Sequence, residues 1–340
     1  MHYKMIIKAN SWKDVENKMK AFEIFGANGT ESKYVKEIDI TDDMLSSYKS
    51  YKEKEESKDS FKEYCEWYND YESFPQSTDM NAVDVEDKKW GYIIVDENEN
   101  VVKVIKRDNP NGNYDYYSLN FPFSAYYIKN GVSIPFGIEP SNENHVSLED
   151  FYNREISEKV FNIKEGISVS DIDLTNTYNY LYKKCRHEYD TLKAMTNGLK
   201  YKPLEHFIKK HGLTLEDYAW SKEEYKPAIK EHESQEFYVA LRKVFWNRNE
   251  YKDFDQDLYS YPLIMYTWSF EEYFEYKRNA FFRAYGYIYR SKWITNYDRN
   301  RKYSGEKKEL KRIVKWTKEI HDFIFNKDKN KKIFILDVHR

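Results

Sequence analysis

The chain has 340 residues, of which 33% are charged, 40% hydrophobic and 18% aromatic. This composition excludes a disordered chain, a collagen and a coiled-coil rod, and the length permits two or three domains. The longest apolar run, from Tyr261 to Trp268, is too short to cross a bilayer, and no secretory signal peptide is visible. Cys65 and Cys185 stand far apart without a partner at metal-ligand spacing, so we expect a cytoplasmic location and no metal.

Charge is distributed unevenly along the sequence. Residues 51–100 contain 6 basic and 15 acidic side chains, whereas residues 277–318 contain 14 basic side chains and only three acidic ones, Asp298, Glu306 and Glu309. The net charge of −3 conceals this asymmetry. The two regions either pair with each other or serve different partners. Glycine is scarce, with 11 residues, which argues against a glycine-rich phosphate-binding loop. We therefore expect no cofactor.

Hydrophobic periodicity and turn residues predict the elements in chain order. The expected strands cover residues 3–9, 34–40, 90–95, 101–106, 125–128, 132–136, 259–268 and 332–338. The expected helices begin at Ser11, Thr41 and Ser147, then cover residues 173–192, 204–210, 215–219, 233–246 and 306–325. Ser269 and Glu272 can cap a helix within residues 273–289, although strands are an alternative there.

Strands at both ends of the chain, with helices between them, predict an α+β fold. In this fold a mixed or antiparallel sheet includes the N- and C-terminal strands, and the middle of the chain forms a largely helical insertion. The corresponding domains are an α+β sheet domain at residues 1–146, the helical insertion at 147–255, and a basic C-terminal part at 256–340 that returns to the sheet.

The basic segment 277–318 is the clearest binding candidate. Its cations alternate with tyrosine and tryptophan, a mixture that suits RNA or single-stranded nucleic acid because cations contact phosphates and aromatic rings stack on bases. The candidate binding residues are Arg299, Arg301, Lys307, Lys308, Lys311, Arg312 and Lys315. The alternative, a solvated helix face paired with the chain's own acidic block, is equally compatible with the sequence.

A second candidate surface follows the turn sequence Asn109-Pro110-Asn111-Gly112. Turn chemistry of this kind presents Tyr114, Tyr116 and Tyr117 at a strand edge. Tyr114 and Tyr116 alternate, so we expect them to share one face of a strand. Core packing is the default role for such a pair, and a binding platform is the alternative.

Asp337 and His339 are the one pair with catalytic or metal-binding potential. Alternate residues on a strand point to the same face, so their side chains are neighbours. A metal needs a third ligand, and none stands at a fixed spacing. We therefore favour a terminal strand with polar side chains and assign neither a catalytic residue nor a metal ligand.

The stretch from Asn109 to Tyr117 resembles a motif of a poorly characterised family of phage and prophage accessory proteins, in which Asn-Pro precedes aromatic-Asp-aromatic-Tyr. Other parts of the chain also resemble the family and occur in the same order along the sequence. They are the N-terminal strand, the helix around Phe61 to Tyr64, residues 170–173, and the closing Asp337-x-His339. The family typically continues with Ile-Gly-Gly-Arg-Trp, where this chain has Leu119 and Asn120, which puts any function of that turn in doubt. The resemblance implies a viral accessory origin and no particular reaction.

These observations lead to one leading hypothesis and two alternatives. The leading hypothesis is a phage accessory protein that acts by binding in the host cytoplasm, as an inhibitor of a host defence complex such as a CRISPR effector. Its partner is then a host protein or ribonucleoprotein. The first alternative is direct nucleic-acid binding, with RNA as the partner, through residues 277–318. The second is a metal-dependent phosphodiesterase that uses Asp337 and His339.

Overall fold

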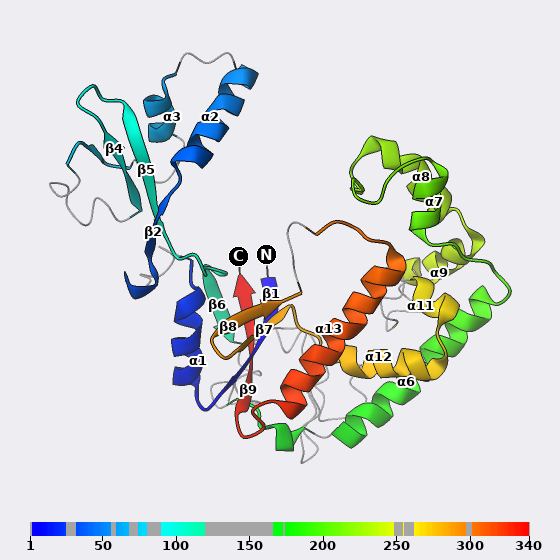
Figure 1. Cartoon of the computed structure of the whole chain (residues 1–340). Helices are drawn as coiled ribbons and strands as arrows, with labels where there is room; N and C mark the ends of the chain where they lie inside the picture. The colour runs from blue at the N-terminus through cyan, green and yellow to red at the C-terminus, as the bar shows by residue number, and fades with distance from the viewer. Residues whose placement is uncertain are drawn as a thin grey trace. The chain divides into compact units, whose positions relative to one another are not determined.

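The computed structural model describes residues 2–24, 32–55, 59–67, 74–79, 90–119, 166–172, 174–247, 254, 262–296 and 301–339. These residues form two compact units (Figure 1). The first unit comprises Met1–His2, Glu16–Tyr117 and Val338–Arg340, and the second comprises Tyr3–Val15 and Ser118–Asp337. The expected hairpin at 125–136 and the helix beginning at Ser147 lie outside the described residues.

Both ends of the chain contribute to one five-stranded mixed sheet, as the sequence predicts. Its strand order is β6-β9-β1-β7-β8. These strands are β1 (His2–Ala9), β6 (Tyr116–Leu119), β7 (Gly286–Tyr289), β8 (Lys292–Thr295) and β9 (Lys332–His339). The predicted α+β class is therefore confirmed. β1 pairs in parallel with β7, and β7 pairs in antiparallel with β8.

The first unit contains a second, four-stranded sheet with the order β2-β5-β4-β3. Its strands are β2 (Lys36–Asp39), β3 (Gln76–Ser77), β4 (Gly91–Val95) and β5 (Val101–Asp108), and the unit also contains the helices α2 (Thr41–Glu55) and α3 (Phe61–Trp67). The predicted hairpin of β4 and β5 is confirmed by their antiparallel register. The two helices contribute Met44, Tyr64 and Cys65 to a core that includes Ile93 and Val104 of the sheet.

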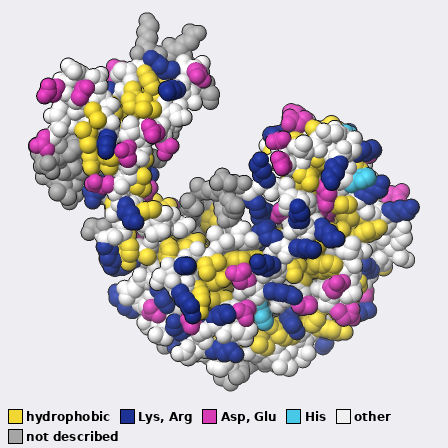
Figure 2. Space-filling view, in the orientation of Figure 1, with side chains coloured by type: hydrophobic (Ala, Val, Ile, Leu, Met, Phe, Trp, Pro, Cys, Tyr) yellow, Lys and Arg dark blue, Asp and Glu magenta, His cyan; other side chains and the backbone are white. Residues whose placement is uncertain are grey.

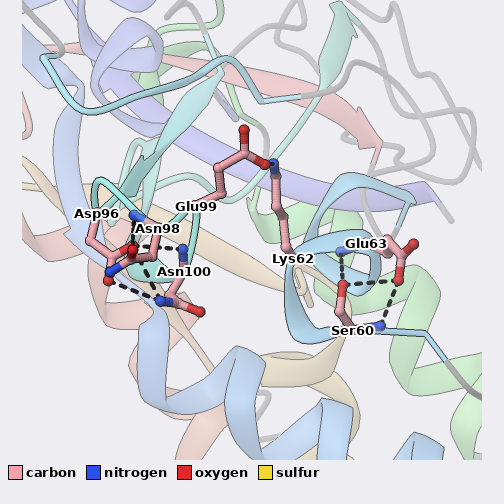
Figure 3. A network of polar contacts seen from close by, with 7 residues as sticks. All are labelled: Ser60, Lys62, Glu63, Asp96, Asn98, Glu99 and Asn100. Carbon is pink, nitrogen blue, oxygen red and sulfur yellow. Dashed lines mark hydrogen bonds and ion pairs between the residues drawn. The ribbon is translucent and has the colours of Figure 1, made fainter.

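Polar contacts fasten the helix α3 and the β4–β5 turn of the first unit (Figure 3). Ser60 and Glu63 form a reciprocal capping box, in which the Ser60 backbone N–H donates to Glu63 and the Glu63 backbone N–H donates to the Ser60 hydroxyl. Asp96 accepts hydrogen bonds from the backbone N–H groups of Asn98 and Asn100. The exposed Lys62–Glu99 ion pair, at 2.7 Å, joins the helix to the turn. Several acids of the 51–100 block therefore have local partners.

The second unit is mainly helical before its final strand. Its helices are α6 (Leu174–Thr196), α7 (Leu204–Lys210), α8 (Lys226–Glu233), α9 (Glu236–Trp246), α11 (Pro262–Thr267), α12 (Phe270–Ala280) and α13 (Glu306–Asn326), and α1 (Trp12–Met19) begins in this unit. α12 starts with the predicted capping box of Ser269 and Glu272. No helix among the described residues is long and apolar enough to cross a membrane.

Three local expectations in this region are wrong. Residues 262–267 form α11 where a strand was expected, because Ile264 and Met265 pack into a helical core that overrides their β propensity. Residues 215–219 form turns and no helix. α8 is an additional helix, and it precedes a shorter α9 than the periodicity of residues 233–246 predicts.

The helix α13 joins the two cores of the second unit. Its first half packs Leu310 into the helical core formed by α6, α9, α11 and α12. Its second half packs Trp316, Ile320 and Phe323 against residues of the five-stranded sheet. Apolar residues at this spacing fall on one side of the helix, so the other side is left for polar residues. The position of α13 is therefore fixed along its whole length.

A buried ion pair lies between α6 and α12. Glu188 is fully buried, and its carboxylate lies 3.5 Å from the Lys277 ammonium and accepts a hydrogen bond from the Tyr273 hydroxyl. Lys277 belongs to the basic segment 277–318, yet its side chain is almost completely enclosed. This lysine is a structural counter-ion.

Removal of that counter-ion tests its role. Lys277→Met leaves the buried Glu188 carboxylate unpaired, so we expect unfolding free energy to fall by about 3–5 kcal/mol. Chemical denaturation of the full chain measures this change. Lys318→Met, which removes an exposed ion pair with Glu275, is the matched control and should cost less than about 1 kcal/mol. Equal costs for the two variants would contradict a structural role for Lys277.

Candidate binding site at the N-terminal end of helix α13

One face of α13 carries a row of exposed lysines. Lys307, Lys308, Lys311, Lys315 and Lys318 are exposed, and at about 100° per residue they fall within a sector of about 100° opposite the buried side. Figure 2 shows Lys and Arg side chains gathered over this helix. Lys318 pairs with Glu275. The other four, which we call the lysine face, have no ion-pair partner within the described ranges.

The arginines expected beside these lysines have a different role. Arg299 lies outside the described residues. Arg301 donates to the Glu309 carboxylate at 2.7 Å, and Arg312 donates to the same carboxylate at 3.3 Å and also to Asn296. In the described part of the basic segment, the cations that form ion pairs do so with Glu188, Glu275 and Glu309. Arg312 fixes local structure, and the lysine face carries most of the exposed positive charge of α13.

Most aromatic side chains of the basic segment belong to the core. Tyr287 and Trp316 are buried, with ring centroids 5.9 Å apart, and the Trp316 indole N–H donates to the Ala284 carbonyl. Tyr289 packs against the same core. An alternating pattern of cations and aromatic residues suggested a continuous stacking surface. The fold instead turns these rings inward, because they supply much of the apolar surface that α13 and the sheet bury.

A cavity of about 530 Å³ lies beside the first turn of α13. Its wall combines aromatic rings, among them Tyr218, Trp220 and Tyr303, with charged groups of Arg301 and Glu306. Trp220 is 59% exposed, so it lies at the rim. A volume of this size falls within the range of roughly 300–1,000 Å³ that is typical of small-molecule sites.

Glu306 ends a chain of hydrogen bonds in the wall of this cavity. The Tyr201 hydroxyl donates to the Glu306 carboxylate at 2.6 Å and lies 3.0 Å from His232 Nε2. The other Glu306 oxygen accepts from the Leu263 backbone N–H at 2.9 Å. Burial raises the pKa of Glu306 to about 7, and these two hydrogen bonds oppose the rise. Burial also lowers the pKa of His232 to about 4, so this imidazole is neutral near neutral pH.

A glutamate from another helix caps α13. Gly305, the residue before the helix, provides no side-chain cap, and Glu205 of α7 instead accepts the Glu306 backbone N–H at 3.0 Å. The Tyr303 hydroxyl donates to the same Glu205 oxygen at 3.3 Å. A carboxylate in this position interacts favourably with the positive end of the helix dipole. Glu205 therefore connects α7 to the first residue of α13 and to Tyr303 in the cavity wall.

The tyrosine motif is arranged differently from the expectation. Tyr114 is only 2% exposed and precedes β6, where it contacts Tyr117 edge to face. Tyr116 is 47% exposed and stacks on His339 with ring centroids 4.6 Å apart. The expected shared face of Tyr114 and Tyr116 is wrong, because the chain has not yet entered the strand at Tyr114.

The structure joins two motif pieces that are 224 positions apart in sequence. His339 Nδ1 lies 2.9 Å from an Asp115 carboxylate oxygen, and the Asp115 backbone N–H donates to the His339 carbonyl. Partial burial raises the pKa of Asp115, but hydrogen bonds from His339 and from the Tyr116 backbone outweigh it and leave a lowered value. The spacing of Asp337 and His339 suggested a pair along β9. In the structure the imidazole also hydrogen-bonds to Asp115, which the sequence pattern did not indicate.

Sequence reasoning missed the cavity at α13, although one signal was present. Glu306 and Glu309 are two of the three acids in a strongly basic segment, and both side chains are buried. An isolated acid in such a segment, within the first turn of an amphipathic helix, indicates a specific local partner. Glu205, His232 and Tyr201 gave no comparable signal, because their proximity depends on the packing of α7 and α8.

Neither a metal set nor a known relative accounts for these arrangements. Within the described residues, no three His, Cys, Asp or Glu side chains are grouped so that they could hold a metal ion. No family model, no curated protein and no solved structure matches this chain.

The buried Glu306 carboxyl makes stability depend on pH. Its pKa is about 7 in the folded state against 4.5 ordinarily, so the folded chain keeps a proton that the unfolded chain loses between these values. The resulting stabilisation is complete below pH 4.5 and is lost as pH rises to about 7. Glu306→Gln removes this pH-dependent loss of stability, because an amide does not titrate. The site can accept the amide, since the Tyr201 hydroxyl can then accept a hydrogen bond from it and donate to His232.

We therefore compare the unfolding free energy of Glu306→Gln with that of the wild type. The difference should shift in favour of the variant by on the order of 2 kcal/mol when the pH is raised from 5 to 8. Urea denaturation at both pH values measures the difference, and the slope contributed by His232 cancels because both proteins contain it. Glu271→Gln, at an exposed position of α12, is the control. An unchanged difference between pH 5 and pH 8 would show that Glu306 does not titrate in this range.

A glycine pair tests the cap of α13. Gly305 has φ of 101° and ψ of 148°, a region that only glycine adopts readily, and a Cβ there would lie 3.1 Å from the Glu205 carboxylate. Gly198 also has a positive φ, 75°, but has open space around its Cβ position. Gly305→Ala should lower unfolding free energy by about 2–3 kcal/mol and Gly198→Ala by about 1 kcal/mol. Equal losses in thermal denaturation would mean that the Glu205 contact contributes little.

Proposed function

We propose that this protein acts by binding and that its lysine face on α13 binds the phosphate backbone of single-stranded RNA. The observation that supports this proposal is the set of four exposed lysines, Lys307, Lys308, Lys311 and Lys315, along a helix whose opposite side is fixed in two cores. A rigid row of cations gains affinity from each phosphate that it neutralises, because condensed counter-ions are released.

The geometry of the row favours a flexible strand. The lysine face covers two turns of helix, or about 12 Å along the axis, so its charges follow a line instead of forming a broad patch. A single strand can adjust its phosphates to such a line. The aromatic side chains of Trp220 and Tyr303, beside the first turn of the same helix, add surfaces on which an unpaired base can stack.

The resemblance of the Asn109–Tyr117 stretch to phage accessory proteins gives this binding a biological setting. In that setting the RNA belongs to a host ribonucleoprotein, such as a CRISPR effector, and occupation of the RNA inhibits the complex. Charge steering by the lysine face accelerates such an encounter and makes it sensitive to salt. The exposed Tyr116 on His339 is a second surface for contacts with the protein component.

Charge reversal on the lysine face tests the proposal. The triple variant Lys307→Glu, Lys311→Glu, Lys315→Glu should bind a fluorescent single-stranded RNA at least tenfold more weakly in an anisotropy titration. Its slope of log affinity against log salt should fall by about 2, since each phosphate contact contributes about 0.7.

The matched control reverses three exposed lysines on other helices of the same unit, Lys183, Lys230 and Lys243. This control changes the net charge equally and should retain most of the affinity and the full salt slope. An equal loss of affinity in both variants would reduce the effect to net charge. Undiminished binding by the lysine-face variant would exclude the proposed surface.

A further inference from the structure

The cavity beside α13 has the features of a site for a flat aromatic ligand. Tyr218 and Tyr303 line it with ring centroids 5.0 Å apart, and Trp220 lies at its rim with 59% of its surface exposed. Tyrosine and tryptophan rings bind aromatic ligands by stacking, with little conformational freedom to lose. An exposed indole beside a cavity is also costly to leave in water, so a stacked ligand would cover apolar surface.

The polar groups of the cavity define which atoms such a ligand presents. Glu306 uses one lone pair on each oxygen, for Tyr201 and for Leu263, and a carboxylate has about four such sites. Above its pKa of about 7 the ionised Glu306 carboxylate accepts hydrogen bonds at the remaining sites, which favour adjacent N–H donors on the ligand. Arg301 uses one donor for Glu309, and its other guanidinium N–H groups suit an anionic oxygen such as a phosphate.

We propose that this cavity binds the guanine base of a nucleotide, with the base stacked against the aromatic lining, its N1–H and amino group on the Glu306 carboxylate, and its phosphate toward Arg301 and Lys307. This inference rests on the proposed function when the nucleotide is part of an RNA strand that continues along the lysine face. A free guanosine phosphate has the same chemistry and is the other source.

Guanine fits this donor and acceptor set better than the other bases. Its Watson–Crick edge offers two neighbouring N–H donors, which match the two oxygens of one carboxylate. Adenine and cytosine place a ring-nitrogen acceptor beside their amino group, and this acceptor meets the carboxylate lone pairs with repulsion. Uracil offers a single N–H donor between two carbonyl oxygens. Recognition of an unstacked base by its Watson–Crick edge and by stacking is the usual mode in single-stranded RNA.

The cavity and the lysine face both begin at the first turn of α13. Glu306 and Lys307 are consecutive residues in the first turn of α13, one directed to the core and the other exposed. Glu205 fixes the backbone at this point through the Glu306 N–H. In the proposed complex the sugar and phosphate of the bound nucleotide lie where the row of cations begins, and the adjacent nucleotides follow the helix.

Two exposed tryptophans of the second unit provide a matched pair for the test. Trp220 lines the cavity, whereas Trp246, which is 71% exposed at the end of α9, does not. Titrations at pH 8, where Glu306 is ionised, use oligouridine, the same oligomer with one central guanosine, and the four free nucleoside monophosphates. We expect the guanosine oligomer to bind about tenfold more tightly than oligouridine. Trp220→Ala and Glu306→Gln should abolish this preference and retain the salt slope, while Trp246→Ala should retain both.

The outcomes separate this inference from the proposed function. If guanosine monophosphate binds, Trp220→Ala abolishes this binding, and neither oligomer binds, the cavity is a guanine site and the RNA function fails. If both oligomers bind equally, Trp220→Ala behaves as Trp246→Ala does, and no monophosphate binds, the guanine site is excluded even though the lysine face binds RNA. Preference for adenosine over guanosine would also overturn the assignment, because the carboxylate geometry predicts the reverse.

Discussion

The first turn of α13 depends on three carboxylates, two of which, Glu306 and Glu309, are buried. Glu205 caps the helix from α7, Glu306 accepts hydrogen bonds from Tyr201 and Leu263, and Glu309 neutralises two arginines. A buried carboxylate is tolerated only where hydrogen bonds or counter-charges replace water. These partners come from different segments, so satisfying the three carboxylates fixes the entry of α13, the wall of the cavity and the direction of the lysine face together.

The same helix separates charge that the sequence mixes. Residues 277–318 alternate cations and aromatic side chains, but the fold sorts them by environment. Lys277 becomes the counter-ion of Glu188, and Arg312 is engaged by Glu309, whereas the lysines on the outer side of α13 keep their charges in solvent. Desolvation explains this sorting, because a cation without a partner remains where water solvates it. The exposed positive charge of the segment is therefore smaller than the total charge of its 14 basic side chains.

Both ends of the chain meet in one sheet, and this arrangement also joins the parts of a sequence motif. His339 stacks under Tyr116 and hydrogen-bonds to Asp115, so residues from either side of a long helical region form one small polar cluster. An ordered Asp–His pair with an exposed ring is a suitable contact surface. Its assembly requires the neighbouring positions of β6 and β9, which the alternating pattern of either strand alone does not contain.

The sequence alone determined the α+β class, the terminal strands, the β4–β5 hairpin and the amphipathic α13, because local periodicity and capping residues such as Ser269 encode these features. The tertiary structure decided what local patterns cannot express. α11 is helical because a helical core surrounds Ile264, and Tyr114 is buried where the chain, before it enters β6, forms a bridge with Glu23. The cavity combines residues that lie as far apart in the sequence as Tyr201 and Glu309. Such a site depends on packing between distant segments, and packing is a property of the whole chain.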